Sequence, residues 1–411
     1  MTLLRRLLIA GSGGSFTVPV GFESFTISDA PEGGWSEVGA PRGAYNSMTD
    51  QTIIGYVCGN DRPNDIEVIA WDHASQTKVG PVQLHDHLTG GISTDPDSHN
   101  APAVLVAADG TYITAYCAHR ASTMWIRRST TTDIEGGWEL EQNTTLPSAQ
   151  YTYPNLVYLS DNDTYYLFWR DGSSLYVANS TDGWTTLNDG PTNIYTAPGH
   201  LYFAITTNSV DRIDIVVTDT APELSGGNGL WHFYATSAGT FHETDGTTIS
   251  GLPFDTTDLT EVQPTDGDIF PYSLSYTADG RPVVGCATQQ STPIMNFEYR
   301  WSGSAWERHD VAETGPYTVG GTAGANICIF DDATRAVLTL REGIGDLGQV
   351  DEYRTDDDGE TWTFYRHVTT DAIQPAGYVH VRDAAPELKV LWMEGPFPAG
   401  DDFSVGTAGY A

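Results

Sequence analysis

The sequence predicts an all-β protein, a seven-bladed β-propeller closed by its N-terminal strands. Three observations predict this fold: helical periodicity is nearly absent, a two-strand pattern recurs along the chain, and the last copy of that pattern lacks its second half. The chain has 411 residues, and its 11% of aromatic residues recur regularly, so it can bury a sizeable core. We therefore expect an N-terminal arm (residues 1–14) followed by a single propeller domain (residues 15–411).

The recurring unit is an apolar run, a turn and a second apolar run that ends near a Trp or Tyr. The first runs lie at residues 52–58, 111–118, 165–170, 213–218, 282–287, 336–340 and 388–393. The second runs include residues 66–71, 124–128, 175–179, 230–234, 297–301 and 350–354. Turns such as Asp109-Gly110 and Asp279-Gly280 precede many first runs, because Gly and Asp tolerate the positive φ of a tight hairpin. Seven copies predict seven four-stranded blades.

The two ends of the chain complement each other in this scheme. The seventh first run has no predicted partner, since the chain beyond Met393 is rich in Gly and Pro. Residues 16–20 and 25–28 read as spare strands. Pairing these strands with the last copy would close the ring and leave no open sheet edge.

One repeat carries the Asp-box pattern Ser/Thr-x-Asp-x-Gly-x-Thr-Trp, and its fixed positions are Thr355, Asp357, Gly359, Thr361 and Trp362. A degraded copy occupies residues 180–184. The Asp side chain of this motif caps a tight hairpin, the Gly takes the strained backbone position, and the Trp packs between sheets. The motif therefore indicates a propeller and does not supply a catalytic Asp.

The charge is strongly acidic. Fifty-four Asp and Glu residues face 19 Lys and Arg residues, a net charge of -35, and Lys78 and Lys389 are the only lysines. Molar salt screens the self-repulsion of such a chain, so the composition is typical of a halophilic protein. An acidic substrate-binding surface is the rival explanation, but it does not account for the lack of lysine throughout the chain. No basic stripe exists to bind nucleic acid or an anionic membrane surface.

The N-terminus places Arg5 and Arg6 before a short apolar run, residues 7–10, and a Gly-Ser-Gly-Gly stretch. The run is too short for a signal peptide's hydrophobic region or a membrane span. Openings of this kind resemble those of tailed-virus structural proteins. We therefore expect the arm to dock on another subunit, with the protein extracellular or on a virion surface in high salt.

Cysteine and histidine spacing gives no metal motif. The four cysteines lie far apart in apolar runs, at Cys58, Cys117, Cys286 and Cys328, and we expect buried free thiols. A disulfide between neighbouring blades remains an alternative. His85 and His87 would share one strand face, but we predict no metal and no cofactor.

Polar residues that stand out gather in the second and third copies: residues 97–102 (DSHNAP), 117–120 (CAHR), 151–155 (YTYPN) and 168–171 (FWRD). This set resembles the BNR-repeat propeller family that includes the ulvan-type polysaccharide lyases. In that family one His precedes the first strand of blade two, a second ends that strand, and a Tyr and an Arg follow from the next blade. The resemblance covers residues 80–245 well and the remainder only as a generic propeller.

The resemblance implies β-elimination on a uronate 4-linked chain. Arg170 would neutralise the carboxylate so that the C5 proton becomes acidic, and His119 would take that proton. Tyr153 would act as acid or proton relay, and His99 would orient the sugar or share the role of base. The substrate-binding candidates are Asn100, Arg120 and Tyr202, although the spacing to Tyr202 departs from the family pattern.

Each candidate also has a purely structural interpretation. His99 with Asn100 would cap a loop, and His119 with Arg120 would pair with nearby carboxylates at a strand end. Tyr153 would pack between blades, and Arg170 would form a surface ion pair with Asp171.

The leading hypothesis is a glycan-directed propeller, a polysaccharide lyase that cleaves an acidic polysaccharide. The alternative is a non-catalytic adhesion or receptor-binding propeller on the particle of a halophilic virus. The expected partner in both cases is a polysaccharide or a cell-surface glycan.

Overall fold

The structure is a computed structural model. It describes residues 33–34, 41–58, 64–86, 97–139, 142–144, 150–186, 189–221, 228–267, 269–288, 294–314, 327–339, 350–368, 375–385, 388–394 and 407–410. The expected arm, residues 1–14, and the spare strands at 16–20 and 25–28 lie outside these ranges. The helical elements in them are two single 3-10 turns, η1 (Ser98–Asn100) and η2 (Thr256–Asp258). No helix in the described part of the chain is long and apolar enough to cross a membrane.

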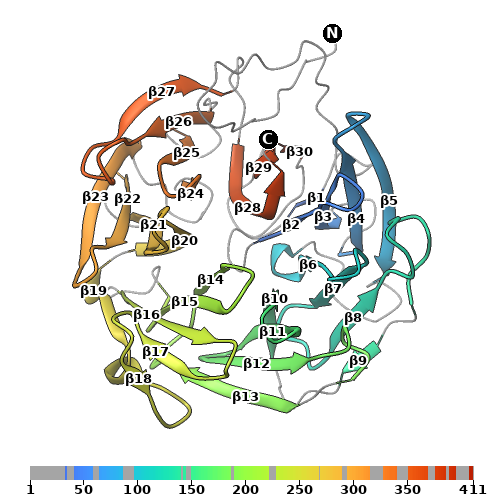
Figure 1. The fold of residues 1–411 in the computed structure, drawn as a ribbon, viewed down its shortest axis with the longest axis horizontal. Coiled ribbons are helices and arrows are strands. Elements are labelled where there is room, and N and C mark those ends of the chain that lie inside the picture. Colours follow the sequence, from blue (N-terminus) through green and yellow to red (C-terminus); the bar gives the residue numbers. More distant parts are fainter. Residues whose placement is uncertain are drawn as a thin grey trace.

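The described strands form a propeller of six hydrogen-bonded sheets arranged around a common centre (Figure 1). Two consecutive four-stranded sheets carry the polar stretches singled out above. They are β6 (Ala103–Val106), β7 (Tyr112–Cys117), β8 (Met124–Arg128) and β9 (Gln142–Thr144), and then β10 (Tyr151–Leu159), β11 (Thr164–Asp171), β12 (Ser174–Ser180) and β13 (Asp189–Thr196).

A six-stranded sheet and two further four-stranded sheets follow. The six-stranded sheet has β14 (Phe203–Thr207), β15 (Arg212–Thr218), β16 (Asn228–Thr236), β17 (Phe241–Glu243), β18 (Thr248–Ile249) and β19 (Thr260–Gly267). The others are β20 (Ile269–Tyr276), β21 (Pro282–Thr288), β22 (Ile294–Trp301) and β23 (Trp306–Thr314), and β24 (Ile327–Phe330), β25 (Arg335–Thr339), β26 (Val350–Arg354) and β27 (Thr363–His367).

The sixth sheet has eight strands and joins the two ends of the described chain. It contains β1 (Gly33–Gly34), β2 (Gly43–Asn46), β3 (Gln51–Cys58), β4 (Ile66–Asp72), β5 (Thr77–His85), β28 (Pro375–Ala385), β29 (Leu388–Glu394) and β30 (Thr407–Tyr410). Its order is β30-β29-β28-β2-β3-β4-β5, with β1 paired to β3.

The prediction of seven separate blades is therefore wrong. All seven predicted first runs are strands (β3, β7, β11, β15, β21, β25 and β29), but β3 and β29 share the eight-stranded sheet. The link is a parallel pair in which Gly43 lies opposite Val381. A Cβ at Gly43 would lie 2.9 Å from Leu391 Cδ1, so the absence of a side chain permits this close approach.

The predicted lack of a partner for the last run is also wrong, because β30 pairs with β29 and places Tyr410 opposite Leu391. Because this terminal segment is rich in Gly, its local sequence pattern does not predict a strand. Closure by N-terminal strands is not shown, since residues 16–20 and 25–28 lie outside the described part. β1, the described strand nearest the N-terminus, pairs with β3.

Side-chain packing between the sheets forms the core. Strands near the centre of the ring are apolar on both faces because each sheet packs against neighbours on either side, as in the burial of nearly every residue of β3. Trp169 and Trp392 are fully buried. The four cysteines are buried and free, as expected, and burial raises the pKa of Cys117 to about 12.

The Asp-box turn connects β26 to β27 and behaves as predicted. Asp357 Oδ1 accepts hydrogen bonds from Thr355 Oγ1 (2.8 Å) and from the Thr361 backbone N–H (2.9 Å), and Gly359 has φ +90°. The hydrogen bonds from Thr361 lower the pKa of Asp357 to about 2. Asp182 in the degraded copy makes the equivalent bond to the Thr186 N–H at 2.9 Å.

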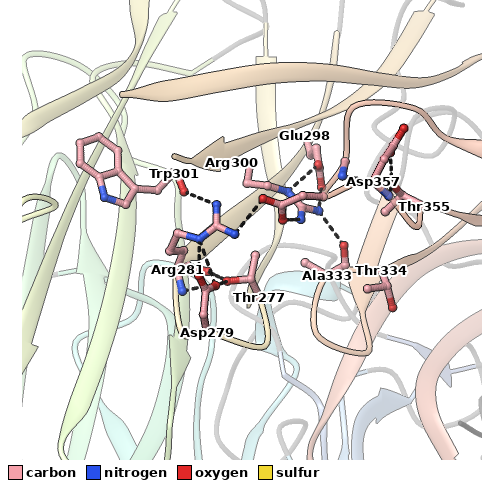
Figure 2. Close-up of polar contacts among 12 residues, drawn as sticks. Thr277, Asp279, Arg281, Glu298, Arg300, Trp301, Ala333, Thr334, Thr355 and Asp357 are labelled. Carbon is pink, nitrogen blue, oxygen red and sulfur yellow. Dashed lines mark hydrogen bonds and ion pairs between the residues drawn. The ribbon is translucent and has the colours of Figure 1, made fainter. Parts of the chain in front are cut away.

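An ion-pair network beside this turn joins two neighbouring sheets (Figure 2). Arg300 on β22 pairs with Glu298 at 3.0 Å and donates to the Ala333 carbonyl, 2.6 Å away in the β24–β25 turn. Asp358, in the Asp-box turn, accepts from both Arg300 (2.6 Å) and Arg281 (2.8 Å). This network locks the sheet of β20–β23 to the sheet of β24–β27.

Candidate functional site

The predicted site residues come from one edge of the ring. His99 lies in η1 directly before β6, and His119 follows the end of β7. Tyr153 lies near the start of β10, and Arg170 lies near the end of β11. Because neighbouring strands are antiparallel, the start of an inner strand and the end of the next one meet at the same edge, as Thr152 opposite Arg170 demonstrates.

A break in β10 sets the direction of Tyr153. The pairing of β10 with β11 shifts between Thr152 and Asn155, and Tyr153 has φ 56°, a rare left-handed conformation for a residue with a side chain. The Arg170 guanidinium carbon lies 4.5 Å from the Tyr153 ring centre and 5.2 Å from the Tyr202 ring centre. The bulge thus places an aromatic ring against a buried cation, a favourable cation–π geometry.

The two histidines form a stacked pair on one carboxylate. Their ring centres are 4.0 Å apart with an interplanar angle of 6°, and the His99 ring also stacks on Tyr153 at 5.2 Å. His99 Nδ1 lies 2.5 Å from Asp97 Oδ1, and His119 Nδ1 lies 2.9 Å from Asp97 Oδ2. Asp97 thus anchors both rings through the same nitrogen of each.

A buried amide network holds the Asp97 loop in place. Asn64 Oδ1 accepts from the Asp97 backbone N–H at 2.8 Å and from Asn100 Nδ2 at 2.7 Å. Asn100 Oδ1 accepts from the His119 backbone N–H at 2.6 Å. Arg42 is fully buried and donates to the Ala101 carbonyl at 3.2 Å. Hydrogen bonds around Asn100 therefore fix the position of the Asp97 loop relative to His119.

The electrostatics of the cluster favour His119 as the general base. Burial lowers the pKa of His119 below its usual value, and the hydrogen bond to Asp97 only partly opposes this effect. Although burial alone would raise the pKa of Asp97, hydrogen bonds from His119 and His99 hold it well below its usual range. An ionised Asp97 accepts from Nδ1–H, which leaves the lone pair of His119 on Nε2. That nitrogen is buried and has no hydrogen-bond partner among the described residues.

Exposure divides the cluster into a rim and a floor. The side chains of Asp97 and His119 are 27% and 22% exposed, whereas Arg170 is 5% and Tyr153 1% exposed. The alternative of a surface ion pair for Arg170 is wrong, because this side chain is buried and donates to the Leu201 carbonyl at 3.1 Å. The alternative that His119 pairs with a carboxylate is correct, and the carboxylate is Asp97.

The three substrate-binding candidates differ in position and exposure. Tyr202 joins the cluster, since its ring centre lies 6.1 Å from that of Tyr153. Asn100 is 2% exposed and scaffolds the corner. Arg120 is exposed, and no hydrogen bond or ion pair of its guanidinium occurs within the described ranges.

Two sets of side chains in the described residues have donor atoms close enough to share a metal ion, and each set keeps them within 4.8 Å of one another: Asp97 with His99 and His119, and Glu307 with His309 and Glu360. In the first set Asp97 already accepts from both Nδ1 atoms, which suits acid–base chemistry. His85 packs against the rings of Tyr116 and Trp125, and His87 lies outside the described residues.

The sequence analysis singled out residues 97–102 but assigned no role to Asp97, and it missed Asn64. Asp97 stands two residues before His99, a spacing that permits a local carboxylate–imidazole contact, and this signal could have identified it. Nothing in the sequence around Asn64 connects it with residues more than 30 positions away.

Comparison with known proteins supports the resemblance drawn from the sequence. The model of the BNR repeat-containing family matches residues 52–314, which is more than half of the chain. No curated protein matches the sequence. Among solved structures, an ulvan lyase of polysaccharide lyase family PL25, bound to -[GlcA(1-4)Rha3S]-, aligns with a TM-score of 0.73 at 15% identity over 94% of this chain and 95% of that one.

Two further solved structures share the fold. An ulvan lyase of the same PL25 description aligns with a TM-score of 0.74 at 15% identity and covers 94% of this chain and 96% of its own. The polysaccharide lyase Uly1 aligns with a TM-score of 0.59 at 12% identity over 98% and 97%. At these identities the likeness establishes the propeller fold.

Proposed function

The chain belongs to the BNR repeat-containing family, and from this premise we propose that it is a polysaccharide lyase that cleaves a uronate-containing polysaccharide by β-elimination. One observation carries the proposal: a basic imidazole nitrogen, a phenol and a buried guanidinium come together from three separate segments. Two solved propellers of the same overall fold are described as ulvan lyases, which supports an acidic glycan as the substrate class.

In the proposed reaction, the partly exposed and the buried residues of the cluster have different roles. His119 Nε2 takes the proton from C5 of the uronate, the C4–C5 double bond forms, and the bond from C4 to the glycosidic oxygen breaks. Tyr153 returns a proton to the leaving oxygen, directly or as a relay. His99, held by the same Asp97, orients the sugar at the rim. Proton transfers of this kind typically contribute about 10² to 10⁴ in rate.

Arg170 is the proposed neutraliser of the substrate carboxylate. As the C5 proton leaves, negative charge spreads onto that carboxylate, and a cation fixed in a low-dielectric floor stabilises the charge without reorganising. Tyr153 and Tyr202 hold the guanidinium in place through their ring faces. The guanidinium geometry also suits a bidentate contact with a carboxylate.

We further propose an extracellular setting at high salt, supported by the net charge of -35 and the presence of only two lysines. Docking on other subunits through residues 1–14 remains a proposal as well.

The test is an assay for unsaturated uronate in molar salt. Purified protein is mixed with a panel of acidic polysaccharides, and ultraviolet absorbance reports each double bond formed. The proposal expects a rise with at least one uronate-containing polymer, and Arg170→Ala should lower kcat about 10²- to 10³-fold while polymer binding weakens less. Arg308→Ala removes a surface cation paired with Asp310 and serves as the matched control.

Two outcomes would contradict the proposal. Binding without cleavage by the wild-type protein would favour the non-catalytic adhesion propeller. Equal activity of the wild type and Arg170→Ala would remove Arg170 from the mechanism.

A further inference from the structure

A cavity lies among the inner strands, and its lining residues differ from those of the histidine cluster. It has a volume of about 360 Å³, and β14, β20 and β28 contribute most of its lining, together with residues at the end of β24. None of His99, His119, Tyr153, Arg170 and Tyr202 lines it. Its lining includes Ser209 and Asp331, which follow the ends of β14 and β24, whereas the histidine cluster lies where inner strands begin. The lining also includes Phe203 at the start of β14, next to Tyr202, so the cavity extends along the inner strands from the side of the cluster toward their far ends.

Arg382 on β28 lines this cavity and is only 7% exposed. Its Nη2 donates to Asn155 Oδ1 at 3.2 Å, but its Nε and Nη1 are buried and have no acceptor among the described residues. The neighbouring Asp383 is exposed, and its Oδ1 accepts from Ser209 Oγ at 2.8 Å. Burial lowers the pKa of Arg382 to about 10, so the side chain is still a cation at neutral pH.

Other buried arginines of the chain are compensated differently. Arg300 is 3% exposed and pairs with Glu298 and Asp358. Arg335 is 5% exposed and pairs with Asp331 and Glu352. Arg42 and Arg170 are also buried, and they donate to backbone carbonyls. Within the described residues Arg382 has neither an ion-paired carboxylate nor a backbone carbonyl acceptor.

The lack of such acceptors around Arg382 has an energetic consequence. A buried guanidinium with unmet N–H groups and no counter-ion costs several kcal/mol, unless a ligand supplies the missing acceptors and charge. Two further carboxylates line the same cavity: Asp331 is already paired with Arg335 and Lys389, and Asp332 is exposed. A cavity of this volume lies within the range that proteins use for small ligands.

We propose that this cavity is an oxyanion-binding site and that Arg382 is its recognition group. The ligand class is a small molecule that carries a carboxylate or a sulfate, because planar or tetrahedral oxygens match the guanidinium fork. Hydroxyl groups and the rings of Tyr272 and Phe330 in the lining suit a sugar ring attached to that oxyanion. The site is separate from the lyase cluster, and its occupancy does not depend on the proposed lyase activity.

The experiment measures thermal stability of the full chain in three sodium salts at equal ionic strength: chloride, sulfate and glucuronate. Because a ligand that binds only the folded state raises Tm by mass action, sulfate or glucuronate should raise Tm by about 2 °C or more over chloride in the wild type. The rise should disappear in Arg382→Met and shrink in Arg382→Lys, which keeps the charge but loses the fork. Arg308→Met, a surface variant, should keep the full rise.

Comparison of the sulfate and glucuronate measurements distinguishes the two possible ligand chemistries. A rise with sulfate alone assigns an inorganic or ester sulfate, and a rise with glucuronate alone assigns a sugar carboxylate. In chloride, Arg382→Met should be at least as stable as the wild type, since it removes an uncompensated buried charge. Equal Tm values in all three salts for the wild type, or a rise that survives in Arg382→Met, would overturn the proposal. Lyase activity is measured on the same samples, so loss of one function is distinguished from loss of the other.

Discussion

The rings of His99 and His119 lie 4.0 Å apart, 6° from parallel, and both turn Nδ1 toward Asp97. Each ring is therefore anchored at the same nitrogen. One carboxylate therefore sets the orientation of both imidazoles, and the ionised state of Asp97 determines which nitrogen of each ring is basic.

Asp97→Asn should reduce lyase turnover without unfolding the protein. An amide has one oxygen acceptor where the carboxylate has two, so one imidazole loses its anchor and the other a charged partner. We expect kcat to fall about 10²-fold or more with a smaller change in KM, measured as double-bond formation. Asp310→Asn, which removes a surface carboxylate, is the control. An unchanged kcat in Asp97→Asn would mean that the carboxylate does not support catalysis.

The pH dependence of kcat/KM should reveal His119 as the base. A protonated His119 cannot accept the C5 proton, so activity is lost as the pH falls through the pKa of this residue. Because burial lowers that pKa, the midpoint of the acid limb should lie below pH 6.5. Above that midpoint the base is neutral and the limb should level off. A midpoint at or above 6.5 would contradict the assignment.

His380 should make the fold sensitive to mild acid. Burial lowers its pKa to about 4, whereas an unfolded chain has a histidine pKa near 6.5. Between these values the unfolded state binds more protons, so the free energy of unfolding should fall as the pH drops from about 6.5 to 4, by at most about 1.4 kcal/mol per pH unit. Urea unfolding of His380→Gln should show a flatter profile, and the exposed His200→Gln should match the wild type.

The Asp-box glycine should be intolerant of a side chain. Gly359 has φ +90°, and a Cβ there would lie 2.1 Å from Glu298 Oε1 and 2.8 Å from Arg300 Nε. Gly280 has φ +83° with no atom within 4 Å of its Cβ position, so it isolates the backbone strain. Gly280→Ala should cost about 1–2 kcal/mol, and Gly359→Ala clearly more, because it also disturbs the ion pair. Equal losses in the two variants would show that the contact with Glu298 is readily relieved.

Dilution of salt should destabilise the protein. With a net charge of -35, repulsion grows as the Debye length rises from about 3 Å at 1 M to about 30 Å at 0.01 M salt. Tm measured across that range should fall steeply. A flat profile would instead favour an acidic surface that serves a binding function.

The strand pattern was predictable because it is local. Apolar runs such as β3 (Gln51–Cys58), Asp-Gly turns and the Asp box are encoded within a few consecutive residues. The candidate site was predictable for a different reason: the order of His99, His119, Tyr153 and Arg170 along the chain matches a family whose model covers the same segment. Hairpin geometry then brings these strand ends to one edge.

The amino-acid sequence by itself therefore determined an all-β propeller and its repeating strands, and it indicated the segments that carry the candidate site residues. Tertiary structure alone decided that β2 pairs in parallel with β28, that β30 completes β29, and that Asp97 and Asn64 organise the histidines. It also decided that Arg382 reaches Asn155 on a distant strand without a carboxylate partner in the described residues. Such contacts join residues far apart in the chain and depend on close approach of packed sheets, for which no local period of the sequence carries a signal.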